Sequence, residues 1–384
     1  MINRKNNNLN NIIKPFFDLK LLFLVVSIIL FGLLVLSTAS IELSSKNFQV
    51  PFHYLFRQIS YLLFSIFVCS IFLYLSTENL KKFSKLLYLM SFLLLCLVLI
   101  PGLGHTANGS MRWLSYGGFN IQPSEFFKLF YIIWLCAYLD KNKKNIGNFS
   151  VFIFPFIALS FAVVVLDRQP DLGSIFVLFI MTLLILFFTK ARYIHIISIG
   201  SVGSIGAVLL IFSSAERLAR FDILNPCQRY LQDSYNLCHS LLAISSGGIS
   251  GSGLGAGTSK LFYLFGSHTD FIFAVLAEEL GIFGVLLIVI LFYLFIRKCF
   301  FIGDRAIRVG LTFQGYLSYA IGIYITLQAY LNISVNLGLV PTKGLALPFF
   351  SYGGSNYLAS MIAVTIIFRI YRDVYKKSLN SSIR

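Results

Sequence analysis

Charged side chains are scarce in this chain of 384 residues: Asp, Glu, Lys and Arg together make up only 12% of it. Soluble globular domains carry about 25% charged residues. Hydrophobic residues, in contrast, reach 57%, and the mean hydropathy is +0.81. The shortage of charge therefore excludes an ordinary soluble globule and predicts an integral membrane protein.

The chain also has no polar segment long enough to form a soluble domain with its own core, and no cleavable signal peptide is expected before its first apolar run. We predict an all-α polytopic membrane protein with a tail over 1–20, a membrane domain over 21–368 and a second tail over 369–384. A large outer loop covers 214–270. Ten predominantly apolar runs are each long enough to cross a hydrocarbon core of ~30 Å, at 21–41, 56–77, 86–101, 123–139, 149–166, 172–189, 194–213, 271–296, 309–336 and 349–368.

The basic residues are unevenly distributed between the segments that join these runs. If the amino terminus is cytoplasmic, ten spans return the carboxyl terminus to the same side, and the inner segments carry 21 of the 31 Lys and Arg residues. This asymmetry fits the positive-inside rule. The formal net charge of +16 thus indicates membrane topology, with both termini cytoplasmic, and requires no nucleic-acid partner.

A glycine-rich segment, SSGGISGSGLGAGTSK (245–260), loosely resembles a dinucleotide-binding loop. No strand is predicted before it, no acidic residue follows at the required distance, and the Gly-Lys-Ser/Thr ending of a phosphate-binding loop is missing. We therefore exclude a nucleotide cofactor. The glycines instead predict a flexible hinge whose backbone approaches another helix or a ligand closely.

Two basic residues at predicted outer helix ends are candidate ligands of an anion. Arg112 lies in NGSMRW with no acidic residue near it in the chain, and Lys343 lies in VPTKGLALPFFSYGGSN, which Pro and Gly interrupt too often for a continuous helix. Irregular backbone is tolerated near lipid only where it is buried in protein or lines a wet cavity. Both positions therefore favour a binding site.

Other polar residues at these ends have both a structural and a functional interpretation. Glu125 and Lys128 share a helix face, which predicts either a neutralised pair or two substrate contacts. In DRQPDLGS, Asp171 either caps the next helix or faces a ligand. A further polar stripe, explained equally well by hydrogen bonds between helices, has one residue every four positions: Gln328, Asn332 and Asn336.

The stretch HTDFIFAVLAEELG (268–281) introduces carboxylates into a predicted membrane helix, where each is costly unless something uses it. Asp270 either caps this helix or takes part in catalysis. Glu278 and Glu279 lie about two turns deeper, ~12 Å at 1.5 Å per residue, and indicate a functional or paired interior. His268 either moves protons or simply lies at the interface.

Two of the six cysteines, Cys227 and Cys238, lie in the long outer loop. An oxidising compartment would allow them to form a disulfide, with two free thiols as the alternative. The other four fall in or beside the predicted spans and are expected to pack as apolar residues.

The candidate charged residues gather at one face of the predicted bundle. A transporter is expected to concentrate its polar groups near the bilayer midplane. The pattern therefore favours chemistry on a lipid-anchored substrate whose head group lies outside the membrane, with cations for its phosphates and carboxylates for its hydroxyls. The residues at this face are Arg112, Glu125, Lys128, Arg168, Asp171, Asp270 and Lys343.

Four motifs, in order, resemble those of the SEDS proteins (shape, elongation, division and sporulation): NGSMRW…QPSEFFK, QPDLGS, SSGGISGSGLGAGTSK…HTDFIFAVLAEELG and PTKGLALPFFSYGGS. The resemblance covers nearly the whole chain after its amino-terminal tail. The PTKG stretch is more similar to the FtsW branch, which acts in cell division, than to the RodA branch, which acts in elongation. The chain departs from the usual pattern at Phe265-Gly266, His239 and Asn356, which bears on the local loop conformation.

The resemblance implies a peptidoglycan glycosyltransferase of the bacterial inner membrane, enriched at the division site, that polymerises lipid II into glycan strands on the outer face. It also implies a ten-helix fold and a complex with a septal class B penicillin-binding protein and other divisome membrane proteins. The family's essential aspartate falls on Asp270, our candidate general base. The charged positions of the family's outer cavity fall on Arg112, Glu125, Lys128, Asp171 and Lys343. We add His268 as a further candidate contact with the substrate.

Arg112 and Lys343 are then expected to offset the charge of the diphosphate leaving group, with a divalent cation, Mg²⁺ or Mn²⁺, as a candidate cofactor. Three alternatives stay open. The first is a lipid II flippase, which the depth of Glu278 and Glu279 favours. The second is a scaffold that only recruits the penicillin-binding partner. The third is an elongation-type, RodA-like polymerase, which would differ in its biological role.

Overall fold

The computed structural model describes residues 18–107, 110–116, 119–212, 226–227, 232–261, 264–341 and 344–382. Within these residues, ten helices coincide with the ten predicted spans. They are α2 (Leu19–Phe48), α3 (His53–Tyr74), α5 (Ser84–Leu97), α6 (Pro123–Lys141), α7 (Phe149–Arg168), α8 (Leu172–Phe187), α9 (Tyr193–Phe212), α12 (Ile272–Arg308), α13 (Thr312–Asn336) and α14 (Gly354–Ser382).

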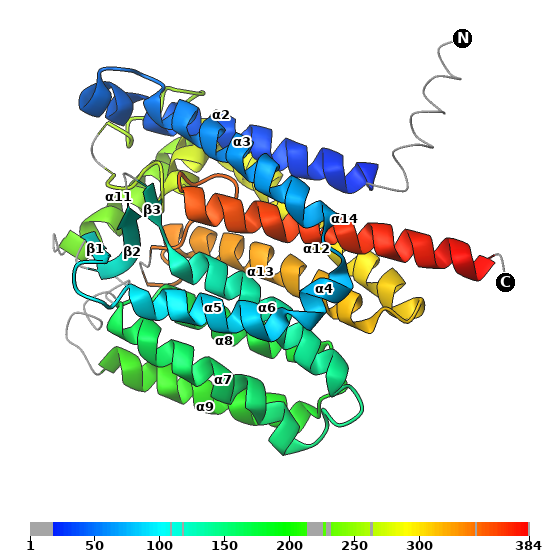
Figure 1. The fold of residues 1–384 in the computed structure, drawn as a ribbon. Helices are drawn as coiled ribbons and strands as arrows, with labels where there is room; N and C mark the ends of the chain where they lie inside the picture. The colour runs from blue at the N-terminus through cyan, green and yellow to red at the C-terminus, as the bar shows by residue number, and fades with distance from the viewer. Residues whose placement is uncertain are drawn as a thin grey trace, which may run out of the picture.

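These helices run side by side in a single bundle (Figure 1). The start of α2 and the end of α14 lie at one end of it, which we call the terminal end. A small sheet, the helix α11 (Gln232–Gly247) and the loop that leads into α12 lie at the opposite end, which we call the sheet end. The two ends therefore differ in structure, and the connections at the sheet end supply most of the candidate site.

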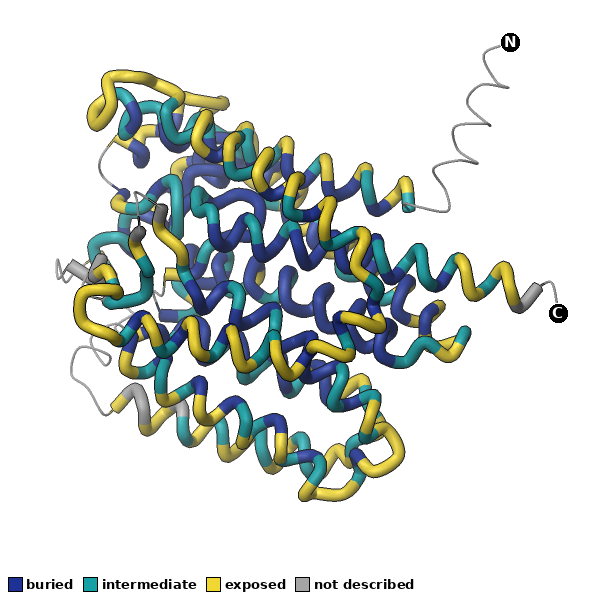
Figure 2. The backbone as a smooth tube through the Cα atoms, in the orientation of Figure 1, coloured by how far each residue is buried: buried dark blue, intermediate teal, exposed yellow. Residues whose placement is uncertain are grey.

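The helix α13 lies in the middle of the bundle, where Figure 2 shows the backbone as mostly buried. Every residue from Phe313 to Ile325 is buried. The outer helices instead expose large apolar side chains such as Phe67 on α3 and Leu209 on α9. An apolar surface of this extent suits contact with lipid rather than with water. By length and composition alone, α2, α3, α7 and α12 are able to cross a membrane.

A three-stranded antiparallel sheet, which the sequence pattern did not predict, joins α5 to α6 at the sheet end. Its strands are β1 (Gly104–Ala107), β2 (Ser110–Tyr116) and β3 (Phe119–Ile121), and Leu114 on the central strand pairs with Gly104 and with Ile121. The strands are too short to give a clear alternating pattern in the sequence. The sheet matters because β2 carries Arg112.

Two helices run further than the apolar pattern predicted. The apolar run of α12 ends near residue 296, but the helix continues to Arg308, and α14 is helical to Ser382 through the segment predicted as a tail. At the amino end of α2, the Asp18 carboxylate accepts from the backbone N–H of Lys20 (3.0 Å) and pairs with Lys298 of α12 (2.7 Å). Charged residues thus support the helices at the terminal end.

The outer-loop cysteines Cys227 and Cys238 form a disulfide, with their Cα atoms 5.0 Å apart. Cys238 lies on the buried face of α11, beside Leu237 and Ser240. The bond therefore ties the chain before α11 to this helix.

Candidate active site

Asp270 lies in the turn that precedes α12, at the sheet end. Phe271 occupies the N-cap position of α12, and its side chain makes no hydrogen bond to the helix. The interpretation of Asp270 as a simple helix cap is therefore wrong. Burial raises the pKa of Asp270 to about 6, and the nearby charge of Arg112 acts in the opposite direction. A carboxyl group that titrates near neutral pH suits a general base.

Arg112 reaches this site from the central strand β2. Its guanidinium donates to the carbonyl oxygens of Gln169 (3.4 Å) and Pro170, and its Nη1 atom lies 3.9 Å from Oδ1 of Asp171. The turn between α7 and α8 therefore fixes one side of the guanidinium group. Asp171 is the acidic neighbour that the sequence around Arg112 did not reveal.

Gly344 brings a third segment to the same place. A Cβ atom added to this glycine would lie 3.1 Å from Oδ2 of Asp270 and 3.6 Å from Nη1 of Arg112. Lys343, the second predicted anion ligand, lies outside the described residues. Its role stays a prediction, although its neighbour in the chain directly lines the site.

The backbone on the amino side of Asp270 is held by the turn before α14. The backbone N–H of Tyr352 donates to the carbonyl oxygen of His268 (2.9 Å), and Oγ of Ser351 donates to that of Thr269 (2.6 Å). Two successive carbonyl groups are thereby fixed to one neighbouring turn.

The carbonyl oxygen of Asp270 itself is held by α13. The side-chain amides of Asn332 and Asn336 both donate to it, at 2.8 and 3.0 Å. Asn332 also donates to the carbonyl oxygen of Leu345 (2.6 Å), and Oδ1 of Asn336 accepts from the backbone N–H of Ala274 (3.2 Å). Two members of the predicted polar stripe, Asn332 and Asn336, therefore hold the Asp270 turn, whereas Gln328 donates to Glu125 on α6.

His268 packs in an aromatic cluster two residues before Asp270. Its ring centroid lies 4.9 Å from that of Tyr54 and 5.9 Å from that of Tyr352. Burial lowers the pKa of His268 to about 4, so the ring is neutral at pH 7. Its buried Nδ1 has no hydrogen-bond partner within the described part of the chain. Its predicted contact with substrate stays a prediction.

Glu125 and Lys128 form an ion pair of 2.8 Å inside the bundle, with 6% and 0% of their side chains exposed. Glu125 also accepts from the side-chain amides of Asn356 (3.0 Å) and Gln328 (3.5 Å). Helices α6, α13 and α14 thus meet through one buried polar network. The pair is neutralised, as one of the two interpretations expected, and a direct contact with substrate stays a prediction.

Asp171 caps α8 and also faces Arg112. Its carboxylate accepts from the backbone N–H (3.2 Å) and the hydroxyl (2.7 Å) of Ser174. The two interpretations of this residue are therefore compatible, because one oxygen serves the cap while lying 3.9 Å from the guanidinium. Its substrate contact stays a prediction.

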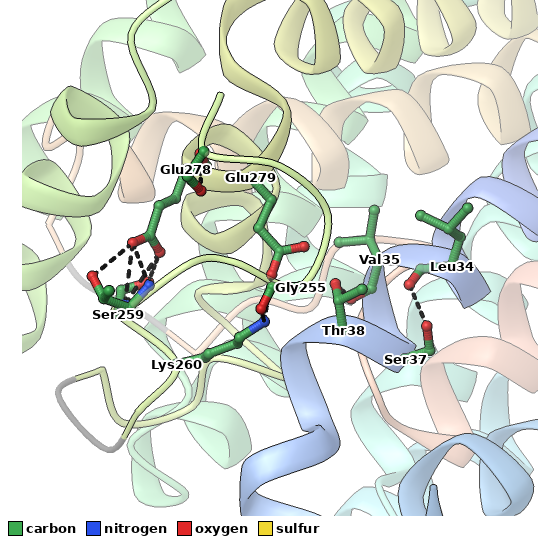
Figure 3. Close-up of polar contacts among 11 residues, drawn as sticks. Leu34, Val35, Ser37, Thr38, Gly255, Ser259, Lys260, Glu278 and Glu279 are labelled. Carbon is green, nitrogen blue, oxygen red and sulfur yellow. Dashed lines mark hydrogen bonds and ion pairs between the residues drawn. The ribbon is translucent and has the colours of Figure 1, made fainter. Parts of the chain in front are cut away.

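Glu278 and Glu279 have partners in the glycine-rich segment (Figure 3). The backbone N–H of Ser259 lies 3.2 Å from both carboxylate oxygens of Glu278, and the Ser259 hydroxyl donates to one of them. Lys260 pairs with Glu279 (2.7 Å) and donates to the carbonyl oxygen of Gly255 (2.7 Å). Both carboxylates inside α12 are thereby satisfied within the protein.

This arrangement needs glycine where the two backbones meet. A Cβ atom on Gly251 would lie 2.2 Å from the carbonyl oxygen of Glu279, and α12 is interrupted at Gly281, which has a φ of 60°. Only glycine adopts such a conformation without strain. The predicted close approach of the glycine-rich backbone to another helix is confirmed.

Within the described residues, no three His, Cys, Asp or Glu side chains gather in a group that could hold a metal ion. The side chains around Asp270 therefore do not fit a divalent cation held by the protein alone.

Two residues of this site were not singled out from the sequence. Gly344 lies between Pro341 and the LALPFF stretch, and its signal was the irregular backbone there. Ser351 had no signal of its own, because a serine in a Gly-rich turn is common and its bond to Thr269 depends on tertiary packing.

The chain resembles known proteins along almost its whole length. The family model FTSW_RODA_SPOVE, described as "Cell cycle protein", matches residues 19–376. A protein of Thioalkalivibrio sulfidiphilus named "Probable peptidoglycan glycosyltransferase FtsW" is 39% identical over 358 residues, which cover 93% of this chain and 90% of that protein. A protein of the same name from Nitrosococcus halophilus is 38% identical over 354 residues, 92% of each chain.

Solved structures agree with these sequence matches. The rod shape determining protein RodA of Thermus thermophilus superposes with a TM-score of 0.67 at 25% identity, over 94% of this chain and 98% of RodA. A chain from a peptidoglycan synthase complex, studied for its structural coordination of polymerization and crosslinking, gives a TM-score of 0.74 at 26% identity, over 94% and 99% of the two chains. The predicted helical membrane fold is confirmed.

Proposed function

The chain belongs to the SEDS family of FtsW, RodA and SpoVE cell cycle proteins, and we propose that it is a peptidoglycan glycosyltransferase of the FtsW type. In this role it polymerises lipid II into glycan strands during septum synthesis. The names of its relatives support the activity. One structural observation carries the proposal: a carboxyl group with its pKa raised to about 6, Asp270, lies beside Arg112 at one end of a membrane bundle.

The reaction requires the C4 hydroxyl of an acceptor sugar to displace a lipid diphosphate from C1 of a donor sugar. A hydroxyl is a weak nucleophile at neutral pH. Asp270, ionised above about pH 6, accepts the hydroxyl proton as the attack proceeds, and a positioned base of this kind typically accelerates a reaction by about 10²–10⁴-fold. A single displacement inverts the anomeric centre.

The departing diphosphate gains negative charge as the bond to C1 breaks. Arg112 is already oriented by the carbonyl oxygens of Gln169 and Pro170, so its guanidinium needs little reorganisation to stabilise that charge. Lys343 is proposed as the second cation. A divalent cation stays a proposal, and the roles of Asp270 and Arg112 do not depend on one.

We place the sheet end at the outer face of the inner membrane and the terminal end in the cytoplasm. The excess of Lys and Arg in the segments at the terminal end supports this orientation. A septal class B penicillin-binding protein and other divisome membrane proteins are the proposed partners. The likeness to a chain of a peptidoglycan synthase complex supports such an assembly.

The proposal is tested with purified protein and its partner, supplied with lipid II in detergent. Glycan polymer is expected on a gel, because detergent offers no second compartment and so isolates polymerisation from transport. Asp270→Asn should lower the rate by at least about 10²-fold while the protein remains folded. The matched control is Asp140→Asn, an acid paired with Lys81 at the terminal end. A fully active Asp270→Asn protein refutes the role of the base.

The flippase alternative depended on two deep carboxylates. Glu278 and Glu279 now have partners in the 245–260 segment, so they no longer favour transport. Absence of polymer in detergent, together with translocation of lipid II in vesicles, would support the flippase instead. Neither activity would be seen from a scaffold.

A further inference from the structure

Asn332 and Asn336 lie one turn apart on α13 and face Asp270. Both are buried, with 1% and 0% of their surface exposed. We propose that these two asparagines are positioning residues, which hold the Asp270 turn in the geometry that the base needs. The inference rests on the proposed function, since it concerns the same reaction.

The two amides act on the backbone and leave the carboxylate available. Both donate to the carbonyl oxygen of Asp270, at 2.8 and 3.0 Å, rather than to its side chain. A donor bonded to the carboxylate would favour its charged form and weaken it as a base. The arrangement therefore fixes the position of Asp270 without lowering its basicity.

Asn332 also sets the spacing between two walls of the site. Its amide nitrogen bridges the carbonyl oxygens of Asp270 (2.8 Å) and Leu345 (2.6 Å). Leu345 follows Gly344, where an added Cβ atom would lie 3.1 Å from Oδ2 of Asp270 and 3.6 Å from Nη1 of Arg112. One amide group thus ties the turn that carries the base to the segment that carries the opposite wall.

Asn336 ties the same turn to the start of α12. Its Oδ1 accepts from the backbone N–H of Ala274 (3.2 Å), in the first turn of a helix that has no side-chain cap of its own. The same N–H also lies 3.1 Å from the carbonyl oxygen of Phe271, so Asn336 adds a second acceptor, from another helix, to a donor in this first turn. In addition, Oγ of Ser240 on α11 donates to the carbonyl oxygen of Asn336 (2.9 Å).

Ordinary adhesion between membrane helices is the competing explanation for buried asparagines. Adhesion alone does not require the asparagine side chains to bond to any particular acceptor. Here three successive carbonyl groups, those of residues 268, 269 and 270, are each held by a neighbouring segment. Catalytic groups need support to within about 0.5 Å, and misplacement by about 1 Å is able to cost 10²-fold in rate. The convergence on Asp270 favours positioning.

The test compares Asn332→Leu and Asn336→Leu with Ser318→Ala in the full complex. Ser318 is the matched control because it also lies buried on α13 and donates to a backbone carbonyl of α12, that of Cys299 (2.7 Å), but far along the helix from Asp270. The measurements are kcat and KM for lipid II in detergent, the folded fraction and the thermal midpoint. If the leucine variants do not fold, Asn332→Ser and Asn336→Ser replace them, since serine is too short to reach the carbonyl of Asp270.

We expect each asparagine variant to lower kcat per folded molecule by about 10–100-fold, with KM within about twofold of wild type and Ser318→Ala unchanged. Unaltered kcat in folded asparagine variants would overturn the proposal. So would a loss that simply follows the thermal midpoint in all three variants, or a change in KM alone. A wild-type complex that makes no polymer would instead count against the proposed function itself, so the two failures are distinguishable.

Discussion

Gly344 lies so close to Asp270 that a Cβ atom on the glycine would stand 3.1 Å from Oδ2 of the carboxylate. The same atom would lie 3.6 Å from Nη1 of Arg112. A side chain at this position would therefore intrude between the base and the cation, where the reacting groups have to enter.

We expect Gly344→Ala to lower the polymerisation rate by roughly tenfold, because the methyl group displaces groups that must stay aligned. The thermal midpoint should hardly change, since residue 344 is exposed. Initial rates on lipid II measure the effect. Gly353→Ala is the control, because a Cβ atom there meets nothing within 4 Å. Equal rates in the two variants would show that the space beside Asp270 is not used.

The polymerisation rate should fall as the pH drops through about 6, the raised pKa of Asp270. The base acts only when ionised, so activity is present above this pH and is lost below it, by about tenfold per pH unit well below the pKa. The neighbouring His268, whose pKa is lowered to about 4, stays neutral over this range. A rate profile between pH 5 and 8 tests this, and a flat profile would contradict it.

Replacing Arg112 should move the pH at which the polymerisation rate falls to a higher value. The positive charge of Arg112 lowers the pKa of Asp270, so its removal leaves the effect of burial unopposed. Arg112→Gln is compared with Arg305→Gln, a cation that lies over the ring of Phe301 at the terminal end. The pH–rate profile of Arg305→Gln should match that of wild type. If the pH dependence of Arg112→Gln were also unchanged, the charge of Arg112 would not influence the pKa of Asp270.

Breaking the buried pair of Lys260 and Glu279 should destabilise the protein strongly. Their side chains are 5% and 1% exposed, and removal of one partner from a buried pair typically costs about 3–5 kcal/mol. Lys260→Met is expected to lower the thermal midpoint, and the double variant Lys260→Met/Glu279→Leu should recover much of it.

The pair of Lys143 and Asp140 (3.9 Å) provides the comparison, because 50% of the Lys143 side chain is exposed and Asp140 also pairs with Lys81. Such pairs contribute about 0–1 kcal/mol, so Lys143→Met should change little. If Lys260→Met were equally mild, the glycine-rich segment would not depend on this ion pair.

The disulfide between Cys227 and Cys238 should stabilise the folded protein measurably. A closed loop with a sequence separation of 11 corresponds to about 3 kcal/mol in the chain-entropy account. Cys227→Ser/Cys238→Ser should lower the thermal midpoint, and wild-type thiols at these positions should react with an alkylating agent only after reduction. Cys96→Ser is the control, as Cys96 is a free thiol. Two thiols that react without a reductant would rule out the bond.

The helical bundle was predictable because apolar runs of membrane length are unusual in any other setting. Helix ends were predicted less well. α14 starts at Gly354 rather than near 349, because Phe349 adopts a positive φ of 68° in the preceding turn. The charged end of α12 was missed because its residues after 296 are no longer a continuous apolar run.

The candidate site was predictable in its members and not in its contacts. Asp270 and Arg112 were singled out because charge is expensive near lipid. Both side chains lie close to Gly344, and this arrangement depends on how β2, the turn before α12 and the turn before α14 pack together. From the sequence, Asp270 could be either a helix cap or a catalytic residue, and the structure excludes the cap because Phe271 occupies the N-cap position of α12.

The contact between the glycine-rich segment and α12 bears on how the protein is synthesised. Ser259 and Lys260, the partners of Glu278 and Glu279, precede them in the chain by 19 residues. When the two glutamates leave the ribosome, the lysine that pairs with Glu279 and the N–H and O–H donors that bond Glu278 have therefore already been made. A helix carrying two acids is thus able to enter the bilayer alongside its own counter-charge and hydrogen-bond donors, without waiting for a later segment or for another protein.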